Sequence, residues 1–494
     1  MKVLLINPPQ IFYPGSDAPA GNLPLGLMYI ASVLEKAGFK VEILDAFMRG
    51  SSFLKVGDGL EVGMPRAKIK EEIRRRKPDI VGIANPFTCQ AENTIRVADV
   101  VKEVDPNILT VVGGPHATVV PLEFMKEAKN VDVAVIGEGE YTMLDIARLF
   151  EGHKKMSEVQ GIAYRNGETV VMNAPRPFIE NLDELPYPAY HLVDMEQYLN
   201  PENIEYRSFK DRAISMITSR GCPFNCSFCS VHLHMGKMYR AHSAGYVIDH
   251  IAYVVSKYRV KTIFFEDDNL TLDVKRFETI CDKIIERGIR FKWETPNGIR
   301  ADTLTLELLK KMKKSGCQSV FFGIESGDQF ILDNVIDKSL RLEDAERVAK
   351  LCRKVGLRAA AFYIIGFPGE KKENMMRTVN LALRLKREYD LGMHLLVATP
   401  LYGTRLYEEC RAKGFIRENL TTRDFAEVRQ TRGTPLIETP DFTPREVKEI
   451  ALKGFKTYKR LSIINYAKNP VKTLKMALNY PEIVIKFIRD YSGR

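Results

Sequence analysis

The sequence has no uncharged apolar run long enough to cross a membrane. Its longest candidate, residues 18–34, is interrupted by Pro19, Gly21, Pro24 and Gly26, whereas a membrane-spanning helix needs about 20 consecutive apolar residues. The first eight residues are too short for a signal peptide and have the apolar pattern of a first strand. We therefore expect a cytoplasmic protein.

Cysteine is scarce outside one short segment. Of the eight cysteines in 494 residues, three lie within 222–229 and five are scattered. Disulfide frameworks belong to oxidising compartments and are usual in small secreted chains, so we expect reduced thiols. A chain of this length is expected to fold as two or three domains. We interpret the scattered cysteines as small core residues: Cys89, Cys281, Cys317, Cys352 and Cys410.

Excess positive charge is missing from most of the chain. The net charge is +10, but residues 445–494 hold twelve Lys or Arg and four Asp or Glu, which leaves +2 for residues 1–444. No aromatic–basic interleaving is present, so nucleic acid is not an expected partner. Residues 445–463 and 470–491 have the pattern of basic amphipathic helices. Such helices can bind an anionic membrane surface, cover a hydrophobic substrate pocket, or pack on a neighbouring domain.

Residues 1–150 alternate strand and helix but lack the GxGxxG of a nicotinamide-binding Rossmann domain. The expected strands are residues 2–7, 40–45, 79–84, 108–113 and 131–136. Their apolar character predicts a parallel, doubly wound, flavodoxin-like (Rossmann-like) sheet with its ligand at the carboxyl ends of the strands. Glycines in the loops there allow close backbone approach. The candidate ligand-binding residues in these loops are Asn7, Pro24, Leu25, Gly26, Gly113, Gly114, Pro115, His116, Gly137, Glu138, Gly139 and Glu140.

Residues 151–210 are expected to connect two domains. Two alternating runs flank Asn166-Gly167, which is a strong hairpin signal. A second βα series, residues 211–400, then predicts a partial (β/α)6 barrel, and residues 401–494 are expected to form a basic helical C-terminal region. In barrels, chemistry lies at the carboxyl ends of the strands. The polar and glycine residues expected at those ends are Glu266, Asp267, Asp268, Glu325, Ser326 and Gly366.

Cys222, Cys226 and Cys229 follow the first strand of this second series. Thiolates suit zinc or iron–sulfur clusters, and both usually take four protein ligands. Three cysteines without a fourth nearby favour a cluster with one open iron. Zinc completed by His232, His234 or His242 is the alternative.

The spacing Cys-x3-Cys-x2-Cys, with Phe228 before the third cysteine, resembles the signature of the radical SAM enzymes. This resemblance implies that Cys222, Cys226 and Cys229 ligate a [4Fe-4S] cluster and that Phe228 lies near the adenine of S-adenosylmethionine (SAM). It further implies contacts to the SAM amino group from Glu266, Asp267 and Asp268, to its ribose or methionine end from Glu325 and Ser326, and to its adenine from the strand before Gly366. Arg300 or Lys338 is expected to bind its carboxylate.

The loops NPP, PLGL, GGPHAT and IGEGE of residues 1–150 resemble those of cobalamin-binding domains found upstream of radical SAM modules. The first loop, residues 7–22, lacks the Asp-x-His-x-x-Gly that places a histidine below the cobalt. We therefore expect cobalamin without a histidine ligand, and His116 as a hydrogen-bonding residue. A degenerate domain that binds no corrin is the alternative.

Together these features predict a cobalamin-dependent radical SAM enzyme, with methylation of an unactivated carbon of a small molecule or lipid as the first hypothesis. As the family implies, a 5′-deoxyadenosyl radical would activate the substrate and cobalamin would deliver the methyl group. Ring closure, rearrangement or oxidation without methyl transfer is the second hypothesis, and a non-catalytic iron–sulfur sensor or scaffold the third. The related enzymes that transfer methylthio groups carry three more cysteines in the N-terminal domain. Methylthio transfer is therefore disfavoured here, because residues 1–150 hold only Cys89. The expected partners are the substrate, an electron donor for the cluster and, through the basic tail, a membrane surface.

Overall fold

The computed structural model describes residues 1–12, 21–48, 52–56, 59–152, 154–200, 211–428 and 434–468. These residues form two compact units. Unit 1 comprises residues 1–197, 219–243 and 399–429, and unit 2 comprises residues 198–218, 244–398 and 430–494. The cysteine segment therefore belongs to the unit that contains the N-terminal domain, although it follows the first strand of the second series in the sequence.

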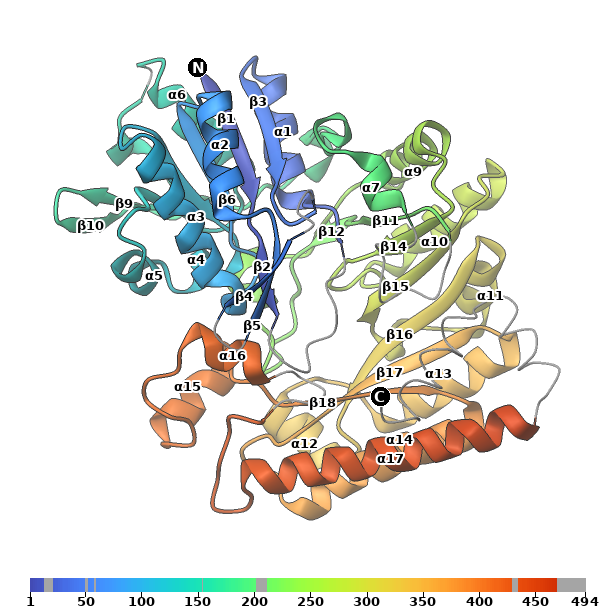
Figure 1. Cartoon of the computed structure of the whole chain (residues 1–494). Coiled ribbons are helices and arrows are strands. Elements are labelled where there is room, and N and C mark those ends of the chain that lie inside the picture. The colour runs from blue at the N-terminus through green and yellow to red at the C-terminus, as the bar shows by residue number, and fades with distance from the viewer. Residues whose placement is uncertain are drawn as a thin grey trace. The chain divides into compact units, whose positions relative to one another are not determined.

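Unit 1 contains a seven-stranded sheet in the order β10-β9-β8-β7-β6-β1-β3 (Figure 1). Five of its strands are parallel and have the 2-1-3-4-5 order of flavodoxin-like folds, as predicted. They are β1 (Lys2–Asn7), β3 (Lys40–Asp45), β6 (Ile80–Ala84), β7 (Leu109–Gly113) and β8 (Val133–Val135). Buried Leu4, Ile6, Val81 and Val112 form the centre of its core.

The predicted hairpin around Asn166-Gly167 is confirmed as β9 (Ile162–Asn166) and β10 (Thr169–Met172). It pairs antiparallel with β8, so the N-terminal sheet continues beyond residue 150. A three-stranded sheet that the sequence pattern did not predict consists of β2 (Gln10–Phe12), β5 (Gly59–Gly63) and β4 (Ser52–Val56).

Three helices of the N-terminal domain, which start at Leu25, Pro115 and Glu140, begin at the loops that the sequence singled out. In this domain α1 packs against α6, and α2 packs against α3. Their bounds are α1 (Leu25–Lys36), α2 (Arg66–Arg76), α3 (Ala91–Val104), α4 (Pro115–Val119), α5 (Pro121–Glu127) and α6 (Glu140–Leu149). The rest of unit 1 includes β12 (Ser219–Arg220), α8 (Val231–Met235), β13 (Arg240–Ala241), α15 (Arg405–Ala412) and α16 (Thr422–Val428).

Unit 2 contains a six-stranded parallel sheet whose spatial order, β11-β14-β15-β16-β17-β18, follows the sequence. Within the described residues, the edge strands β11 and β18 do not pair with each other. The predicted partial barrel of six strands is therefore confirmed. The strands are β11 (Ala213–Met216), β14 (Thr262–Phe265), β15 (Lys292–Ile299), β16 (Cys317–Glu325), β17 (Arg358–Ile365) and β18 (Gly392–Val397).

Helices follow the strands of this sheet: α9 (Ala244–Tyr258), α10 (Val274–Glu286), α11 (Leu306–Lys314), α13 (Leu342–Val355) and α14 (Lys372–Tyr389). The first predicted basic helix of the C-terminal region is α17 (Pro444–Lys468), which lies along α14 (Figure 1). The second, predicted over residues 470–491, lies outside the described residues. No described helix has the length and apolarity that a bilayer crossing requires.

Candidate functional site

The cysteine segment is a loop closed at its base by two short strands. β12 and β13 pair antiparallel, so that Ser219 lies opposite Ala241 and Arg220 opposite Arg240. Gly221 begins the loop with φ +81°, and a Cβ atom there would lie 2.2 Å from the carbonyl oxygen of Met238. Only glycine fits this position without displacing backbone. The glycine before the first cysteine of the motif is thus a local structural requirement.

The three motif cysteines are partly buried thiols within this loop. The Cys222 amide donates to the Gly236 carbonyl (3.2 Å), and the Cys229 amide donates to the Cys226 carbonyl (3.1 Å). Of the five scattered cysteines, Cys281, Cys317, Cys352 and Cys410 are buried, as expected, whereas Cys89 is partly buried. Among the described residues, no three His, Cys, Asp or Glu side chains are grouped around one metal position. The soft thiolate donors of the motif fit an iron–sulfur cluster, and the zinc alternative stays a prediction that this geometry does not test.

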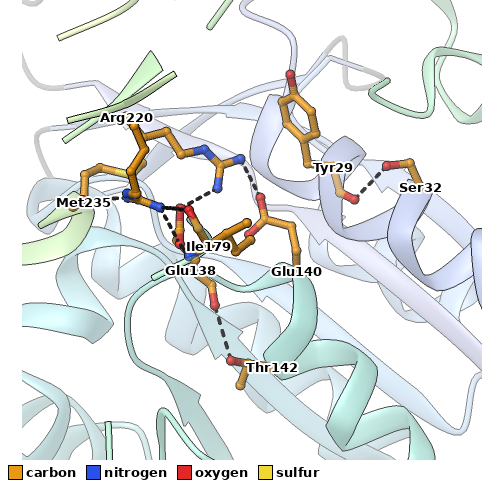
Figure 2. Close-up of polar contacts among 9 residues, drawn as sticks. Tyr29, Ser32, Glu138, Glu140, Thr142, Ile179, Arg220 and Met235 are labelled. Carbon is orange, nitrogen blue, oxygen red and sulfur yellow. Dashed lines mark hydrogen bonds and ion pairs between the residues drawn. The ribbon is translucent and has the colours of Figure 1, made fainter. Parts of the chain in front are cut away.

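Glu138 and Glu140 follow β8 and face the base of the cysteine loop (Figure 2). Arg220 donates to Glu138 (2.7 Å) and to Glu140 (2.6 Å), and Arg240 donates to Glu138 (2.8 Å). Burial acts to lower the pKa of Arg220, but the two carboxylates outweigh it and raise that pKa above its usual range. The guanidinium is therefore charged at every physiological pH. Glu138 and Glu140 therefore bind an arginine at the base of the cysteine loop, and their expected place in the cobalamin site stays a prediction.

The other N-terminal loops have mixed surroundings. Asn7 is buried and donates to Asp45 (3.0 Å), which links the ends of β1 and β3. Pro24 precedes α1, where Leu25 is buried and a Cβ at Gly26 would meet no atom within 4 Å. At the end of β7, Gly113 is followed by Gly114 with φ +126°, and Pro115 starts α4. Gly137 has φ +81°, and Gly139 precedes α6.

His116 is buried in α4, and its Nδ1 lies 3.1 Å from the Thr88 hydroxyl. Its ring also packs against the rings of Phe124 and Tyr402. Burial lowers the pKa of His116 to about 4, so the imidazole is neutral near neutral pH. These contacts agree with the expected hydrogen-bonding role.

Asn85 is a candidate residue that the sequence did not single out. It follows β6 and is fully buried. Its backbone amide donates to the Gly113 carbonyl (2.7 Å). Within the described part of the chain, neither its side-chain nitrogen nor its side-chain oxygen has a hydrogen-bond partner. Buried polar atoms without partners are rare in native structures. An orphaned amide at the strand ends fits an amide-rich ligand such as cobalamin, which makes it the observation that favours a corrin here.

The carboxylates after β14 differ in surroundings within unit 2. Glu266 accepts from the Ser215 hydroxyl (3.0 Å). Asp267 is buried and accepts from the amide (3.1 Å) and hydroxyl (2.7 Å) of Thr218, so it fixes the chain just before the cysteine segment. The Asp268 side chain reaches the solvent, but its crowded surroundings and the charge of Asp267 raise its pKa to about 6. Geometry thus leaves Glu266 and Asp268 better suited than Asp267 to a ligand.

The ends of β16 and β17 carry the remaining expected SAM residues. Glu325 has φ +66° and forms an ion pair with Lys338 (2.8 Å). Ser326 is buried and accepts from the Asp328 amide (3.2 Å). Arg300 binds Asp302 (2.6 Å) and donates to the Lys338 carbonyl (3.1 Å), so Arg300 and Lys338 are neighbours.

Glu370 is a second residue that the sequence analysis did not include among the candidates. Its Oε2 accepts from the amides of Gly366 (2.7 Å) and Phe367 (2.9 Å), and it is fully buried. Burial raises the pKa of Glu370 to about 8 although the two amides act to lower it. Among described atoms its Oε1 has no partner. The GFPGE motif contained the signal: an acidic residue at the end of a glycine-rich turn.

Of the expected site residues, the structure brings the cysteines and the N-terminal loop residues into unit 1, and the SAM residues at the barrel strand ends into unit 2. Phe228 lies between the second and third cysteines in unit 1. The individual roles of these residues stay predictions.

Two family models match consecutive parts of the chain: B12 binding domain over residues 20–147 and Radical SAM superfamily over residues 216–382. The chain is 32% identical to an uncharacterized methyltransferase of Pyrococcus horikoshii, over 92% of this chain and 92% of that protein. It is also 32% identical to the cytidylyl-2-hydroxyethylphosphonate methyltransferase of Streptomyces wedmorensis, over 92% of this chain and 89% of that protein. The solved structure of the cobalamin-dependent S-adenosylmethionine radical enzyme OxsB, with aqua-cobalamin and SAM bound, is similar in fold. Its TM-score is 0.70 at 17% identity, with 100% of this chain and 80% of OxsB covered.

Proposed function

The chain belongs to the cobalamin-dependent radical SAM methyltransferases, and we propose that it methylates an unactivated carbon atom of a small-molecule or lipid substrate. Its cofactors are a [4Fe-4S] cluster, SAM and cobalamin. When bound, the cluster and SAM supply a radical that removes a substrate hydrogen atom, and cobalamin supplies the methyl group. The protein must hold these groups in register and exclude water.

The observation that carries this proposal is the membership of the cysteine loop in the same compact unit as the cobalamin-type loops. Cys222, Cys226 and Cys229 are the ligands we assign to the cluster. The cobalamin site takes the loops after β1, β7 and β8, with Asn85 supplying a buried amide. A chain that used radical chemistry without cobalamin would not need these cobalamin-type loops in the same unit as its cysteine loop.

SAM is assigned to the strand ends of the unit 2 sheet. Glu266 and Asp268 are the carboxylates whose surroundings suit the amino group, since charge-assisted pairs are the stronger hydrogen bonds. Glu325, held near Lys338, is assigned to the ribose or methionine end. Gly366 and Phe367, whose amides are fixed by Glu370, are assigned to the adenine.

The substrate class and the remaining partners rest on the sequence of the tail and on the chemistry. Residues 469–494 hold five Lys or Arg, two Asp or Glu and several large apolar residues, which favours an apolar substrate or an anionic membrane surface. Reduction of the cluster needs an electron donor, for which a small redox protein is proposed. Binding to anionic vesicles by the full chain but not by residues 1–468 supports the membrane proposal; equal binding contradicts it.

The proposed methyl transfer is tested with SAM that carries a trideuterated methyl group. Cluster-loaded, cobalamin-loaded protein is incubated anaerobically with dithionite, this SAM, and fractionated lipid and metabolite extracts. We expect one trideuterated methyl group in a product together with 5′-deoxyadenosine, by mass spectrometry. The Cys226→Ala variant is the control and should give neither.

The same incubation separates methylation from the second hypothesis. Substrate-dependent 5′-deoxyadenosine with an unlabelled, altered product would replace methyl transfer by ring closure, rearrangement or oxidation. Absence of 5′-deoxyadenosine from protein with an intact cluster would contradict radical chemistry altogether.

A further inference from the structure

Glu138 lies at the centre of a buried ionic cluster at the base of the cysteine loop. Its Oε1 accepts from Arg220 (2.7 Å) and Arg240 (2.8 Å), and its Oε2 accepts from Arg240 (2.9 Å) and from the Ile179 amide (2.7 Å). Figure 2 shows the two carboxylates, Glu138 and Glu140, turned toward the guanidinium group of Arg220. Both oxygens of Glu138 are thus bound by protein groups.

The cluster is closed to water and balanced in charge. The exposed fractions are 8% for Arg220, 4% for Arg240, 8% for Glu138 and 5% for Glu140. Two cations therefore face two anions where solvent cannot replace either partner. Charge-assisted hydrogen bonds of this kind are stronger and more directional than neutral ones.

The arginines are tied to several other parts of unit 1. Arg220 lies over the Tyr29 ring of α1, 5.5 Å from its centroid, and Arg240 lies over the Phe178 ring at 4.8 Å. Arg240 also donates to the carbonyls of Ile179 (2.8 Å) and Met235 (2.8 Å), the latter at the end of α8. Ion pairs and contacts with aromatic rings therefore hold each arginine side chain in one position.

The position of the cluster in the chain gives it a specific consequence. Arg220 and Arg240 are paired residues of β12 and β13, so they enclose the loop that contains all three motif cysteines. Glu138 lies between Gly137 and Gly139 in the loop after β8, which belongs to the expected cobalamin site. A displacement of either loop must move the other or break buried ion pairs.

We propose that Glu138 is a positioning residue that couples the two cofactor sites, so that assembly of the iron–sulfur cluster raises the affinity for cobalamin and cobalamin binding stabilises the cluster. This inference rests on the proposed assignment of the cysteine loop and the strand-end loops to these cofactors. By linkage, the two effects have the same magnitude. Couplings between binding sites in proteins are typically about 5- to 150-fold.

The test compares cobalamin binding to full-length protein with and without its cluster. Hydroxocobalamin is titrated into iron-free and cluster-reconstituted protein, and the ratio of the two dissociation constants is the coupling. We expect a ratio of about tenfold for the unmodified chain. Glu138→Gln keeps the shape but removes the charge and places an amide donor beside two arginines, so its ratio should fall to near one.

Asp145→Asn is the matched control. Asp145 lies on α6, is also buried, and binds Lys154 (2.8 Å), Arg148 (3.9 Å) and Arg176; within the described part of the chain it forms no ion pair with the cysteine loop. A general loss of stability would affect both variants, whereas a loss of coupling should be confined to Glu138→Gln. An unchanged ratio in Glu138→Gln, or an equal drop in Asp145→Asn, overturns the proposal.

Two further measurements keep the test decisive. The electron paramagnetic resonance spectrum of the reduced cluster should change on cobalamin addition in the unmodified chain and stay constant in Glu138→Gln. If Glu138→Gln does not fold, Glu140→Gln removes only one Arg220 contact and should lower the ratio partially; no change overturns coupling. If the unmodified chain binds both cofactors but its two cobalamin dissociation constants are equal, this inference alone is rejected. If the chain does not bind cobalamin, the proposed function is rejected as well.

Discussion

Gly26 is the residue at which stability and cofactor binding can be separated most cleanly. It occupies the second position of α1, is exposed, and would accommodate a Cβ with no atom within 4 Å. Gly114, by contrast, has φ +126°, and a Cβ there would lie 2.4 Å from the Asn85 carbonyl oxygen. Backbone geometry therefore explains the glycine at position 114, and nothing among the described residues explains the one at position 26.

Gly26→Ala is predicted to leave the fold of the cofactor-free protein intact while weakening the binding of cobalamin. Alanine in an open helical position stabilises folding by about 0.5–1 kcal/mol relative to glycine. If the corrin lies against this position, the added methyl group should raise the cobalamin dissociation constant about tenfold, or about 1.4 kcal/mol. Thermal melting and spectroscopic titration of the same sample measure both effects. Unchanged affinity would remove the PLGL loop from the binding site.

Glu370 provides a pH prediction. Its pKa is raised by burial to about 8, far above the value of 4.5 expected in an unfolded chain. The folded protein therefore holds the extra proton between these values, so its stability falls as pH rises from about 4.5 to about 8 and levels off above about 8. The loss between about pH 6 and about pH 9 is roughly 3 kcal/mol. Glu370→Gln cannot ionise, so its unfolding free energy should be flat relative to the parent chain over this range. Parallel curves for the two proteins would show that Glu370 ionises normally.

Single residues were predictable where one motif carries the chemistry and unpredictable where distant charges meet. The cysteines and the loop glycines were visible as short patterns. Arg220 and Arg240 were not, because their carboxylate partner Glu138 lies 82 and 102 positions away. Asn85 was missed for a similar reason, since an orphaned amide is recognisable only once its surroundings are known.

At the scale of elements, α17 shows how a basic helix can serve as a packing element. Val447 is fully buried, and its Cγ1 lies 3.1 Å from the point where a Cβ on Gly366 would stand. Ala451 is also buried, whereas Leu452 is 51% exposed. The helix therefore has one face on the barrel, behind the turn assigned to SAM adenine, and one face in solvent.

Val447→Ala is predicted to destabilise unit 2 by about 1–3 kcal/mol, because it leaves a cavity between α17 and the Gly366 turn. Leu452→Ala on the exposed face should change stability by less than about 0.5 kcal/mol. Thermal and urea unfolding of the two variants checks the contrast. Equal effects would show that α17 does not pack on the barrel in solution.

Most elements could be predicted because apolar strands followed by glycine-containing turns indicate βα units in the sequence. The flavodoxin-like order, the Asn166-Gly167 hairpin and the six parallel strands followed from such local patterns. The β2-β5-β4 sheet was missed because its pairing joins residues 10–12 to residues 52–63, across more than one other element. Register between distant short strands is set by tertiary packing, which local pattern does not contain.

At the scale of the whole molecule, each compact unit is built from segments that are not consecutive in the sequence. The segment of residues 219–243 follows β11 in sequence but groups with the N-terminal domain, and residues 399–429 do the same. The cysteines follow the first barrel strand, as predicted, while their contacts group them with unit 1. The buried arginine–glutamate cluster is the physical reason for their grouping with unit 1, since it binds both strands at the base of the loop to the loop after β8.

The central claim, that this chain uses cluster, SAM and cobalamin together to move a methyl group, can be tested without knowing the substrate. Protein loaded with both cofactors is incubated anaerobically with dithionite and SAM, and 5′-deoxyadenosine and S-adenosylhomocysteine are quantified by mass spectrometry. We predict both products from the unmodified chain, loss of S-adenosylhomocysteine when cobalamin is omitted, and loss of 5′-deoxyadenosine in Cys226→Ala. Neither product from protein with an intact cluster and bound cobalamin would contradict the claim.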